Sequence, residues 1–350
     1  MLDPSADPCH ICLITTSTRD VTRDQTDMTK PTAGTAQVNP REITRRHLLK
    51  GAVTSSAVVL TTPIRQGDAR VVSEKPIDAH SHIWTRDVKR FPLTKGSTLD
   101  DLDPRSFTTA ELQAVMNRHN VGRAVLIQHH IYHGYDNSYL VHAARNHPHV
   151  FRIVAMVDDL KPAPGKEMRQ LLKAGATGFR ITSWIRKQNW LKGTGMEAMW
   201  KCGADTRQAI CCLIDPPDLA ALDAMCTRHP ATPVVIDHFA RIGVNGDISE
   251  RDITKLCRLA RHKNTHVKLS AYYALGSKRP PYGDLVPMIR RVLDAFGPSR
   301  CMWASDSPYQ IQGANTYAAS LALITEHCDF LSSGDRDHLL WRTAEKVYFH

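Results

Sequence analysis

The stretch Ile77-Asp78-Ala79-His80-Ser81-His82 determines how the rest of the chain is interpreted. It predicts a short strand, running from Pro76 to His80 or His82, whose end carries two histidines. Side chains at positions i and i+2 of a strand point the same way, so His80 and His82 should project together. Two imidazoles aimed at one point suit a metal ion or an electron-rich substrate oxygen. A His-x-His pair alone is weak evidence, and its weight depends on the residues downstream of it.

Seven further strand-like runs lie downstream, with helical patterns between them. The predicted strands are 123–128, 151–157, 177–181, 209–214, 233–238, 266–270 and 300–304. The predicted helices are 108–122, 137–146, 165–174, 197–206, 218–228, 249–262 and 285–296, with terminal helices at 315–328 and 335–348. This alternation across 76–350 predicts an α/β fold of the (β/α)8 barrel (TIM barrel) type. The alternative is an open doubly wound sheet, but no Gly-rich phosphate loop follows the first strand.

Polar residues end several of these strands. In a barrel the carboxyl ends of the strands meet on one face, where active sites form. The side chains that should converge there are His80, His82, Gln128, His129, Arg180, Asp215, His238, Ser270 and Asp306.

The composition is that of a globular protein, with 42% hydrophobic and 23% charged residues in a chain of 350. The net charge is +10, yet residues 1–70 hold nine Lys/Arg against seven Asp/Glu, so most of the positive charge belongs to the body. Basic runs and aromatic platforms are lacking, which argues against a nucleic-acid partner. The basic body would instead attract an anionic small molecule. The nine cysteines show no metal-type pairs beyond Cys9 and Cys12, and we expect mostly free or packed thiols.

Residues 1–70 are typical of a disordered leader, since their first 40 residues are polar and lack helical periodicity. Within it, Thr44-Arg45-Arg46-His47-Leu48-Leu49-Lys50-Gly51 and the mildly apolar stretch up to Leu60 resemble a twin-arginine export signal, spanning about 44–62. We therefore expect a periplasmic or exported protein whose translation begins at Met28, the alternative being an amphipathic helix on a cytoplasmic protein. No segment is long and apolar enough for stable membrane insertion.

Three motifs in the body resemble the amidohydrolase-2 family of metal-dependent hydrolases. They are Asp78-Ala79-His80-Ser81-His82, Val234-Val235-Ile236-Asp237-His238-Phe239 and Trp303-Ala304-Ser305-Asp306-Ser307-Pro308. The region from Val125-Leu126-Ile127-Gln128 through Asp136-Asn137-Ser138-Tyr139-Leu140 resembles the lactonase branch, which contains 2-pyrone-4,6-dicarboxylate lactonase and sugar lactonases. The resemblance covers 76–350, and its motifs are more specific for the superfamily than for a substrate.

The resemblance implies a metal site in this chain, with one departure. Metal-using members hold zinc with the paired histidines of strand one, a histidine of strand five and the aspartate of strand eight. Here these positions would be His80, His82 and Asp306, but the fifth strand ends in Leu213-Ile214-Asp215-Pro216-Pro217 with no histidine. Either Asp215 or His238 supplies a fourth ligand to Zn²⁺ or another divalent metal, or the site works without metal, as members of the lactonase branch are thought to do.

The resemblance and the residue types together predict a hydrolase that opens a small carboxylated or sugar-derived lactone. Asp306 would activate water, and His80, His82 and His238 would polarise the carbonyl, with or without metal. Arg180 would hold a substrate carboxylate in a bidentate fork, Arg241 is a weaker candidate for the same role, and Gln128, His129 and Tyr132 would line the pocket. Tyr135, Trp184 and Tyr272 would shape its walls.

Two other functions stay open. One is a zinc-dependent decarboxylase of an unsaturated carboxylic acid, which some superfamily members are. The other is a non-catalytic periplasmic barrel that binds a ligand without turnover. The sequence does not decide between a monomer and a homo-oligomer.

Overall fold

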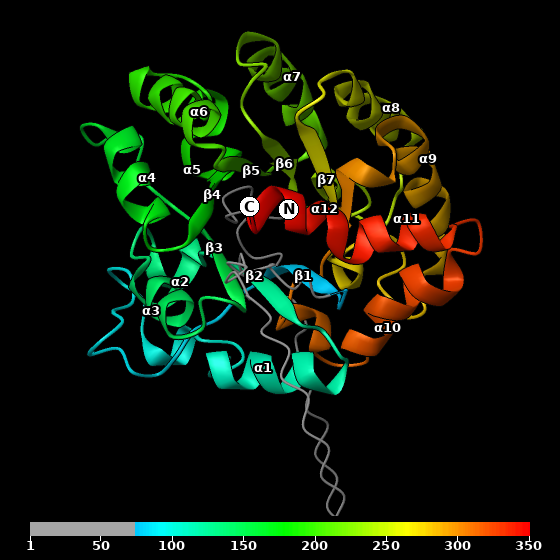
Figure 1. Ribbon diagram of the computed structural model, residues 1–350, viewed down its shortest axis with the longest axis horizontal. Coiled ribbons are helices and arrows are strands. Elements are labelled where there is room, and N and C mark those ends of the chain that lie inside the picture. The colour runs from blue at the N-terminus through cyan, green and yellow to red at the C-terminus, as the bar shows by residue number, and fades with distance from the viewer. Residues whose placement is uncertain (1–73) are drawn as a thin grey trace, which may run out of the picture. The chain divides into compact units, whose positions relative to one another are not determined.

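Eight parallel strands form the centre of the protein. The computed structural model describes residues 74–350, in which the strands pair in sequence order from β1 to β8. They are β1 (Ile77–Ser81), β2 (Arg123–Ile127), β3 (Phe151–Ala155), β4 (Ala176–Thr182), β5 (Ala209–Leu213), β6 (Val234–Ile236), β7 (Thr265–Leu269) and β8 (Cys301–Trp303). Helices surround these strands, as Figure 1 shows. The (β/α)8 barrel is therefore confirmed, with every strand within two residues of its predicted start.

The helices follow the predicted alternation. They are α1 (Thr109–Arg118), α3 (Ser138–Asn146), α4 (Pro164–Leu172), α6 (Thr194–Thr206), α7 (Leu219–Arg228), α8 (Glu250–Arg258) and α9 (Val286–Phe296). The start of α1 was recognisable from its capping box, in which Thr108 accepts a bond from the Glu111 amide and the Glu111 carboxylate accepts one from the Thr108 amide.

Sequence periodicity missed the shortest elements. Two one-turn helices, α2 (His130–His133) and α5 (Ser183–Arg186), follow β2 and β4 directly. The two predicted terminal helices are broken into α10 (Tyr317–Ala322), α11 (Ser333–Asp337) and α12 (Thr343–Tyr348), with wider π-type turns between or after them. Four residues are too few to show a hydrophobic period, which explains the omission of α2 and α5.

The barrel interior is closed at one end by α12, which lies across the strands in Figure 1. Its residues Val347 and Tyr348 share a buried cluster with inward-facing strand residues such as Val125, Cys211 and Met302. A second, larger cluster joins the outer faces of the strands to the surrounding helices. The amino-terminal end of the barrel is thus packed with side chains, which leaves the carboxyl end for a cavity.

The last strand meets the first through a few bonds instead of a regular ladder. The His82 amide donates to the Ser307 carbonyl at 2.8 Å, and the Asp306 amide donates to the His80 carbonyl at 2.8 Å. Beneath them, the Asp78 carboxylate accepts bonds from the Ser305 amide (2.8 Å) and hydroxyl (2.5 Å). These bonds close the barrel and at the same time bring together the first and last predicted site motifs.

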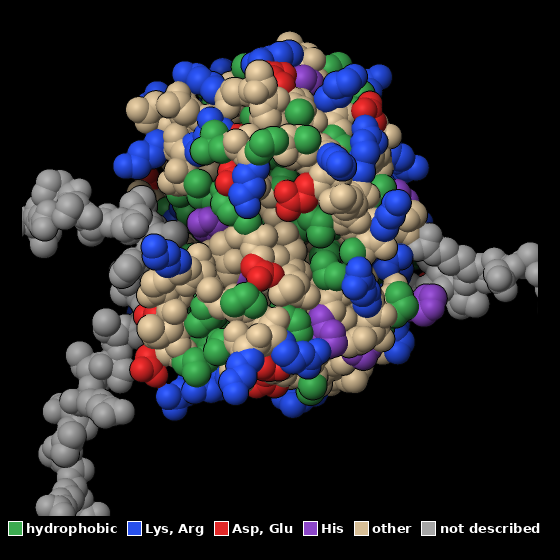
Figure 2. Space-filling model, turned by 90° about the vertical axis from the view of Figure 1, so that its left-hand side faces the viewer, with side chains coloured by type: hydrophobic (Ala, Val, Ile, Leu, Met, Phe, Trp, Pro, Cys, Tyr) green, Lys and Arg blue, Asp and Glu red, His purple; other side chains and the backbone are tan. Residues whose placement is uncertain are grey.

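The cysteines, the surface charge and the helix lengths bear on the remaining sequence predictions. Cys202, Cys211, Cys212, Cys226, Cys257, Cys301 and Cys328 are free thiols, six of them buried, as predicted. Figure 2 shows Lys and Arg side chains scattered over the face that it draws, with acidic side chains and histidines between them. Within residues 74–350 no helix is long and apolar enough to cross a membrane. The predicted leader and its twin-arginine signal lie outside the described residues.

Candidate active site

A cavity of about 270 Å³ opens at the carboxyl end of the barrel. Its walls come from the ends of β1, β2, β4 and β5 and from the segments that follow β6, β7 and β8. The lining residues are His82, His129, His130, Ile131, Arg180, Thr182, Trp184, Ile185, Leu213, His238, Arg241, Ala271, Tyr273, Ala274, Leu275 and Asp306. This volume suits a small molecule of a few rings at most.

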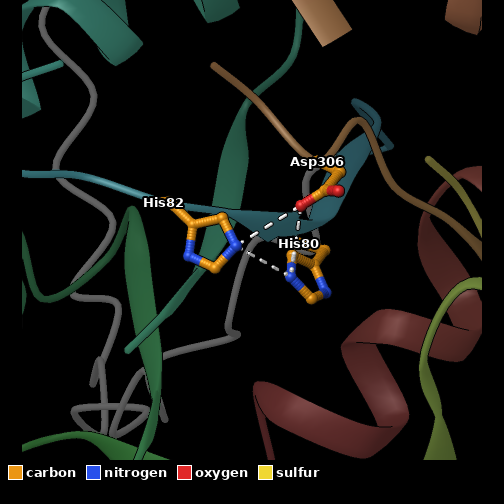
Figure 3. A group of neighbouring side chains, drawn as sticks. All are labelled: His80, His82 and Asp306. Atoms are coloured by element: carbon orange, nitrogen blue, oxygen red, sulfur yellow. Dashed lines mark hydrogen bonds and ion pairs between the residues drawn. The ribbon is translucent and has the colours of Figure 1, made fainter. Parts of the chain in front are cut away.

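Asp306 forms a triangle with the two histidines of the opening motif (Figure 3). Its Oδ1 atom is 3.4 Å from His80 Nε2 and 3.4 Å from His82 Nε2, and these two nitrogens are 3.4 Å apart. On the other side, Asp306 Oδ2 accepts a 2.8 Å hydrogen bond from the Tyr273 hydroxyl. Asp306 is 4% exposed, and its backbone is left-handed with a φ of 62°. A non-glycine residue held in this conformation is typical of functional sites.

The carboxylate form of Asp306 is favoured. Burial raises the pKa of its carboxyl, but the imidazoles of His238, His82 and His80 lower it more, so the pKa ends well below its ordinary value. The pKa of His238 falls to about 4, chiefly because of burial, and burial also lowers the pKa of His80 well below its ordinary value. Near neutral pH the site therefore offers an ionised base beside the neutral imidazoles of His80 and His238.

His238 reaches the site through an unusual turn. From His238 to Arg241 four consecutive residues have φ values of 53–57°, in the left-handed region. The turn points His238 Nε2 toward Asp306 Oδ2 at 3.8 Å, and the Ser270 hydroxyl lies 2.8 Å from His238 Nδ1. Ser270, which the sequence placed at the end of a strand, thus orients an imidazole of the cavity wall.

Beneath the cavity floor lies a buried group of charged residues. Lys268 Nζ is 3.0 Å from Asp237 Oδ1 and 3.2 Å from His80 Nδ1, and Arg180 is 3.7 Å from Asp237 Oδ2. Asp237 and Lys268 have no solvent exposure. Burial opposes ionisation of Asp237, but Lys268, His80 and Arg180 outweigh it and keep its pKa well below the ordinary value. Asp237 is therefore ionised in the interior, with Lys268 and Arg180 on either side of it.

Two arginines line the cavity, and they differ in their hydrogen-bond partners. Arg180 is only 7% exposed and its Nε atom has no hydrogen-bond partner among the described residues, so the guanidinium has donors left for a ligand. Arg241 instead donates to Asp215 Oδ1 at 2.7 Å and stacks on the Trp184 ring at 4.5 Å. The Trp184 indole also donates to Asp215, at 2.9 Å. Arg180 is thus the stronger anion-binding candidate of the two.

Not every predicted residue reaches the cavity. Gln128 and Tyr132 do not line it, which corrects the expectation for both. The Gln128 side chain instead donates to the carbonyls of Gly134 and Asp136, and it is fully buried. The Tyr132 ring stacks behind His129, with centroids 4.2 Å apart, and its hydroxyl accepts a bond from the Asp103 amide. Tyr132 thus supports His129, which does face the cavity.

The predictions for Asp215 and Tyr272 also need correction. Asp215 is engaged by Arg241 and Trp184, and it belongs to neither of the possible metal groups among the described residues. Tyr272 is fully buried and its hydroxyl donates to the Leu269 carbonyl at 2.8 Å, whereas the next residue, Tyr273, lines the cavity. The turn that follows β7 therefore directs Tyr273 into the cavity and Tyr272 into the protein interior.

Sequence reasoning missed Asp237, Lys268, Tyr273 and Tyr309 as members of the site. Tyr309 lies 2.6 Å, hydroxyl to Nε2, from His129. The signal available for Lys268 was its place inside a strand, between the buried residues Val267 and Leu269. A lysine in such a position is rarely buried without a charged partner, which points to an interior role.

The positions of His80, His82 and Asp306 fit a metal ion. A tetrahedral zinc ion with bonds of about 2.0–2.1 Å has ligand atoms about 3.4 Å apart, which matches the three separations in this group. Asp306 Oδ1 is also buried without a hydrogen-bond partner among the described residues. The second possible group, His80, Asp237 and His238, does not fit, because the Lys268 ammonium already lies between its first two members.

Comparisons with known proteins show which proteins this chain resembles. The chain is 28% identical over 277 residues to L-fucono-1,5-lactonase from Burkholderia ambifaria, covering 78% of this chain and 94% of the relative. It is 28% identical over 243 residues to 2-pyrone-4,6-dicarboxylate hydrolase from Comamonas testosteroni, covering 67% and 76%. The crystal structure of an amidohydrolase from Burkholderia multivorans with bound zinc shares the fold, with a TM-score of 0.67, 20% identity, and coverage of 79% and 99%.

The family model described as Amidohydrolase matches residues 77–349, which is the whole barrel. Its match includes both the His-x-His stretch and Asp306, whose proximity the structure shows independently. The chain therefore belongs to the amidohydrolase family.

Proposed function

We propose that the protein is a lactonase, which hydrolyses the ring ester of a small lactone. The observation that carries the proposal is the buried Asp306 carboxylate, which lies among three imidazoles at the base of a cavity that Arg180 also lines. The lactonase and hydrolase names of the relatives support the same reaction.

In the first step, Asp306 would act as a general base. A water molecule that donates to Asp306 Oδ1, the oxygen without a hydrogen-bond partner among the described residues, would attack the lactone carbonyl carbon while its proton passes to the carboxylate. The carbonyl oxygen becomes an oxyanion, which an N–H group of His238 in the cavity wall would stabilise. His80 is fully buried behind Asp306 and does not line the cavity, so it would act through Asp306.

In the second step, the ring opens. The oxyanion re-forms the carbonyl, the bond to the ring oxygen breaks, and the proton held by Asp306 passes to the leaving oxygen. The product is a hydroxy acid, and Asp306 returns to its carboxylate form. The Tyr273 hydroxyl would hold the carboxylate in place throughout by donating to Oδ2.

A divalent metal is compatible with the same residues. His80, His82 and Asp306 would hold it, and a bound ion would polarise the carbonyl and make water more acidic. Arg180 and Tyr273 do not belong to this group of ligands.

The substrate class follows from Arg180 and from the size of the cavity. A carboxylated lactone would place its carboxylate on the guanidinium, whereas a sugar lactone would present hydroxyls to it. The side chains of Arg180 and Lys268 share a single carboxylate, that of Asp237. The carboxylate of a bound substrate would give Arg180 a second anionic partner.

A hydrolysis screen with a pH indicator tests the proposal. The purified protein is assayed against sugar lactones, dicarboxylate lactones and simple lactones, with Asp306→Asn as the blank. We expect acid release by the wild type alone. Release of carbon dioxide from an unsaturated carboxylic acid, without acid release from any lactone, would instead establish the decarboxylase. Ligand binding without turnover of any kind would establish the non-catalytic barrel.

A further inference from the structure

Lys268 is a fully buried lysine for which lactone hydrolysis assigns no role. It lies in β7 with 0% exposure, and the Tyr348 ring closes the space below its Nζ at 5.5 Å. Its polar neighbours are Asp237, in an ion pair at 3.0 Å, and His80, in a hydrogen bond at 3.2 Å. The hydrogen bond goes to Nδ1, the nitrogen of His80 that faces away from Asp306.

This contact decides which nitrogen of His80 carries the proton. An ammonium group has three donors and no acceptor. For the 3.2 Å contact to be a hydrogen bond, His80 Nδ1 must therefore accept, and a neutral His80 then carries its proton on Nε2. In the other tautomer two N–H groups would face each other at 3.2 Å in the interior, next to a positive charge.

The hydrogen bonds of His82 are consistent with this assignment. His82 Nδ1 lies 2.9 Å from the Ile127 carbonyl, which can only accept, so Nδ1 donates and Nε2 of a neutral His82 is an acceptor. The His80 Nε2–H then faces two acceptors, His82 Nε2 and Asp306 Oδ1, each at 3.4 Å. Lys268 thus donates to His80, and the His80 Nε2–H is directed at His82 Nε2, with Asp306 Oδ1 beside it.

We infer that Lys268 is a positioning residue that fixes the tautomer of His80 and thereby weakens metal binding at His80, His82 and Asp306. A histidine that ligates through Nε2 needs a lone pair there, and it normally donates its other N–H to a carbonyl or carboxylate. His82 meets this condition and His80 does not, because the cation lies closer to its Nδ1 than Asp237 Oδ1, which is 3.5 Å away. The three positions have the spacing of a zinc site, but one of them presents a proton.

The inference concerns the same site as the proposed lactonase function. Its test measures the His80 tautomer and the zinc affinity and needs no turnover, so the inference and the proposed function can fail separately. The first measurement is ¹⁵N NMR of the metal-free full chain labelled at histidine, with His80 assigned by the signals lost in His80→Gln. We expect the shifts of a neutral imidazole protonated at Nε2. Protonation at Nδ1, or an equal mixture of the two tautomers, would overturn the inference, and no Lys268 variant is needed for this result.

The second measurement is the zinc affinity, determined by competition with a chromogenic chelator. Lys268→Met should bind zinc about 10- to 100-fold more tightly than the wild type, the range over which groups behind a ligand usually act. The double variant Lys268→Met/Asp237→Leu, which removes the buried ion pair as a unit, should show the same gain if the single variant does not fold. Lys255→Met, at a partly exposed lysine on α8, is the control and should keep the wild-type affinity. Unchanged affinity in folded Lys268 variants would refute the inference.

Discussion

The Asp78 carboxyl should make the stability of the barrel depend on pH in a predictable direction. Asp78 is fully buried below the seam between β8 and β1, where it accepts bonds from Ser305, the Tyr317 hydroxyl (2.9 Å) and the His80 amide (3.2 Å). Burial is the largest influence and raises its pKa from 3.8 to about 6, although these hydrogen bonds lower it in part. The perturbation that isolates this group is Asp78→Asn, which keeps the shape of the side chain.

The sign and size of the effect follow from linkage. The folded state binds the proton more tightly than the unfolded state, so stability is highest below the unfolded pKa of 3.8 and is lost as pH rises toward and through about 6. A shift of about two pKa units corresponds to roughly 3 kcal/mol in total. Between about pH 4 and pH 7 the wild type should therefore lose about 2 kcal/mol relative to Asp78→Asn.

Urea unfolding at intervals across the range from about pH 4 to about pH 7 measures this difference, since the other titrating groups are common to both proteins. Asp247→Asn, at an exposed position, controls for the removal of one acidic group. If the unfolding free energies of wild type and Asp78→Asn ran parallel across this range, the assignment of a raised pKa to Asp78 would be refuted.

Four further predictions concern activity and export. Asp306→Asn should reduce kcat about 10²- to 10⁴-fold, the usual contribution of a general base, and near-wild-type turnover would remove Asp306 from the mechanism. Arg180→Gln should raise KM for carboxylated lactones more than for neutral ones, and an equal change for both would show that it binds no carboxylate. Tyr273→Phe should shift the acid limb of the kcat/KM profile to higher pH, because the carboxylate loses a stabilising donor, whereas an unshifted limb would contradict this role. Replacing both arginines of the leader motif with lysine should retain the protein in the cytoplasm, which cell fractionation would detect, and unchanged export would exclude the twin-arginine route.

The fold was predictable because its signals are local and repeated. Each strand is a short apolar run and each main helix has a period of its own, so errors at single boundaries do not change the architecture. The one-turn helices α2 and α5 escaped because no period exists over four residues. They matter for the site, since Ile131 of α2 and Trp184 of α5 line the cavity.

The site was predictable only where a residue ends a strand. His80, His82 and Asp306 come together because the carboxyl ends of parallel strands share one face. Tyr273 could not be distinguished from Tyr272, because the turn after β7 is left-handed at Ala271 and no local sequence pattern indicates this. The pairing of Lys268 with His80 joins β7 to β1 past the intervening strand β8, and no local pattern encodes a contact between residues so far apart in the chain.

The seam between β8 and β1 links the stability of the barrel to the geometry of its site. The bonds that replace a regular ladder there also hold Asp306 in a left-handed conformation that an aspartate would not adopt unaided. A change at Ser305 or Asp78 would thus loosen the barrel and misplace the base together. Arg180 and Trp184 lie on the opposite wall, where Arg180 belongs to β4 and pairs with β5 through its backbone, so the pairing does not depend on its side chain. Substrate preference can therefore change at that wall while the seam, and with it the reaction, stays the same.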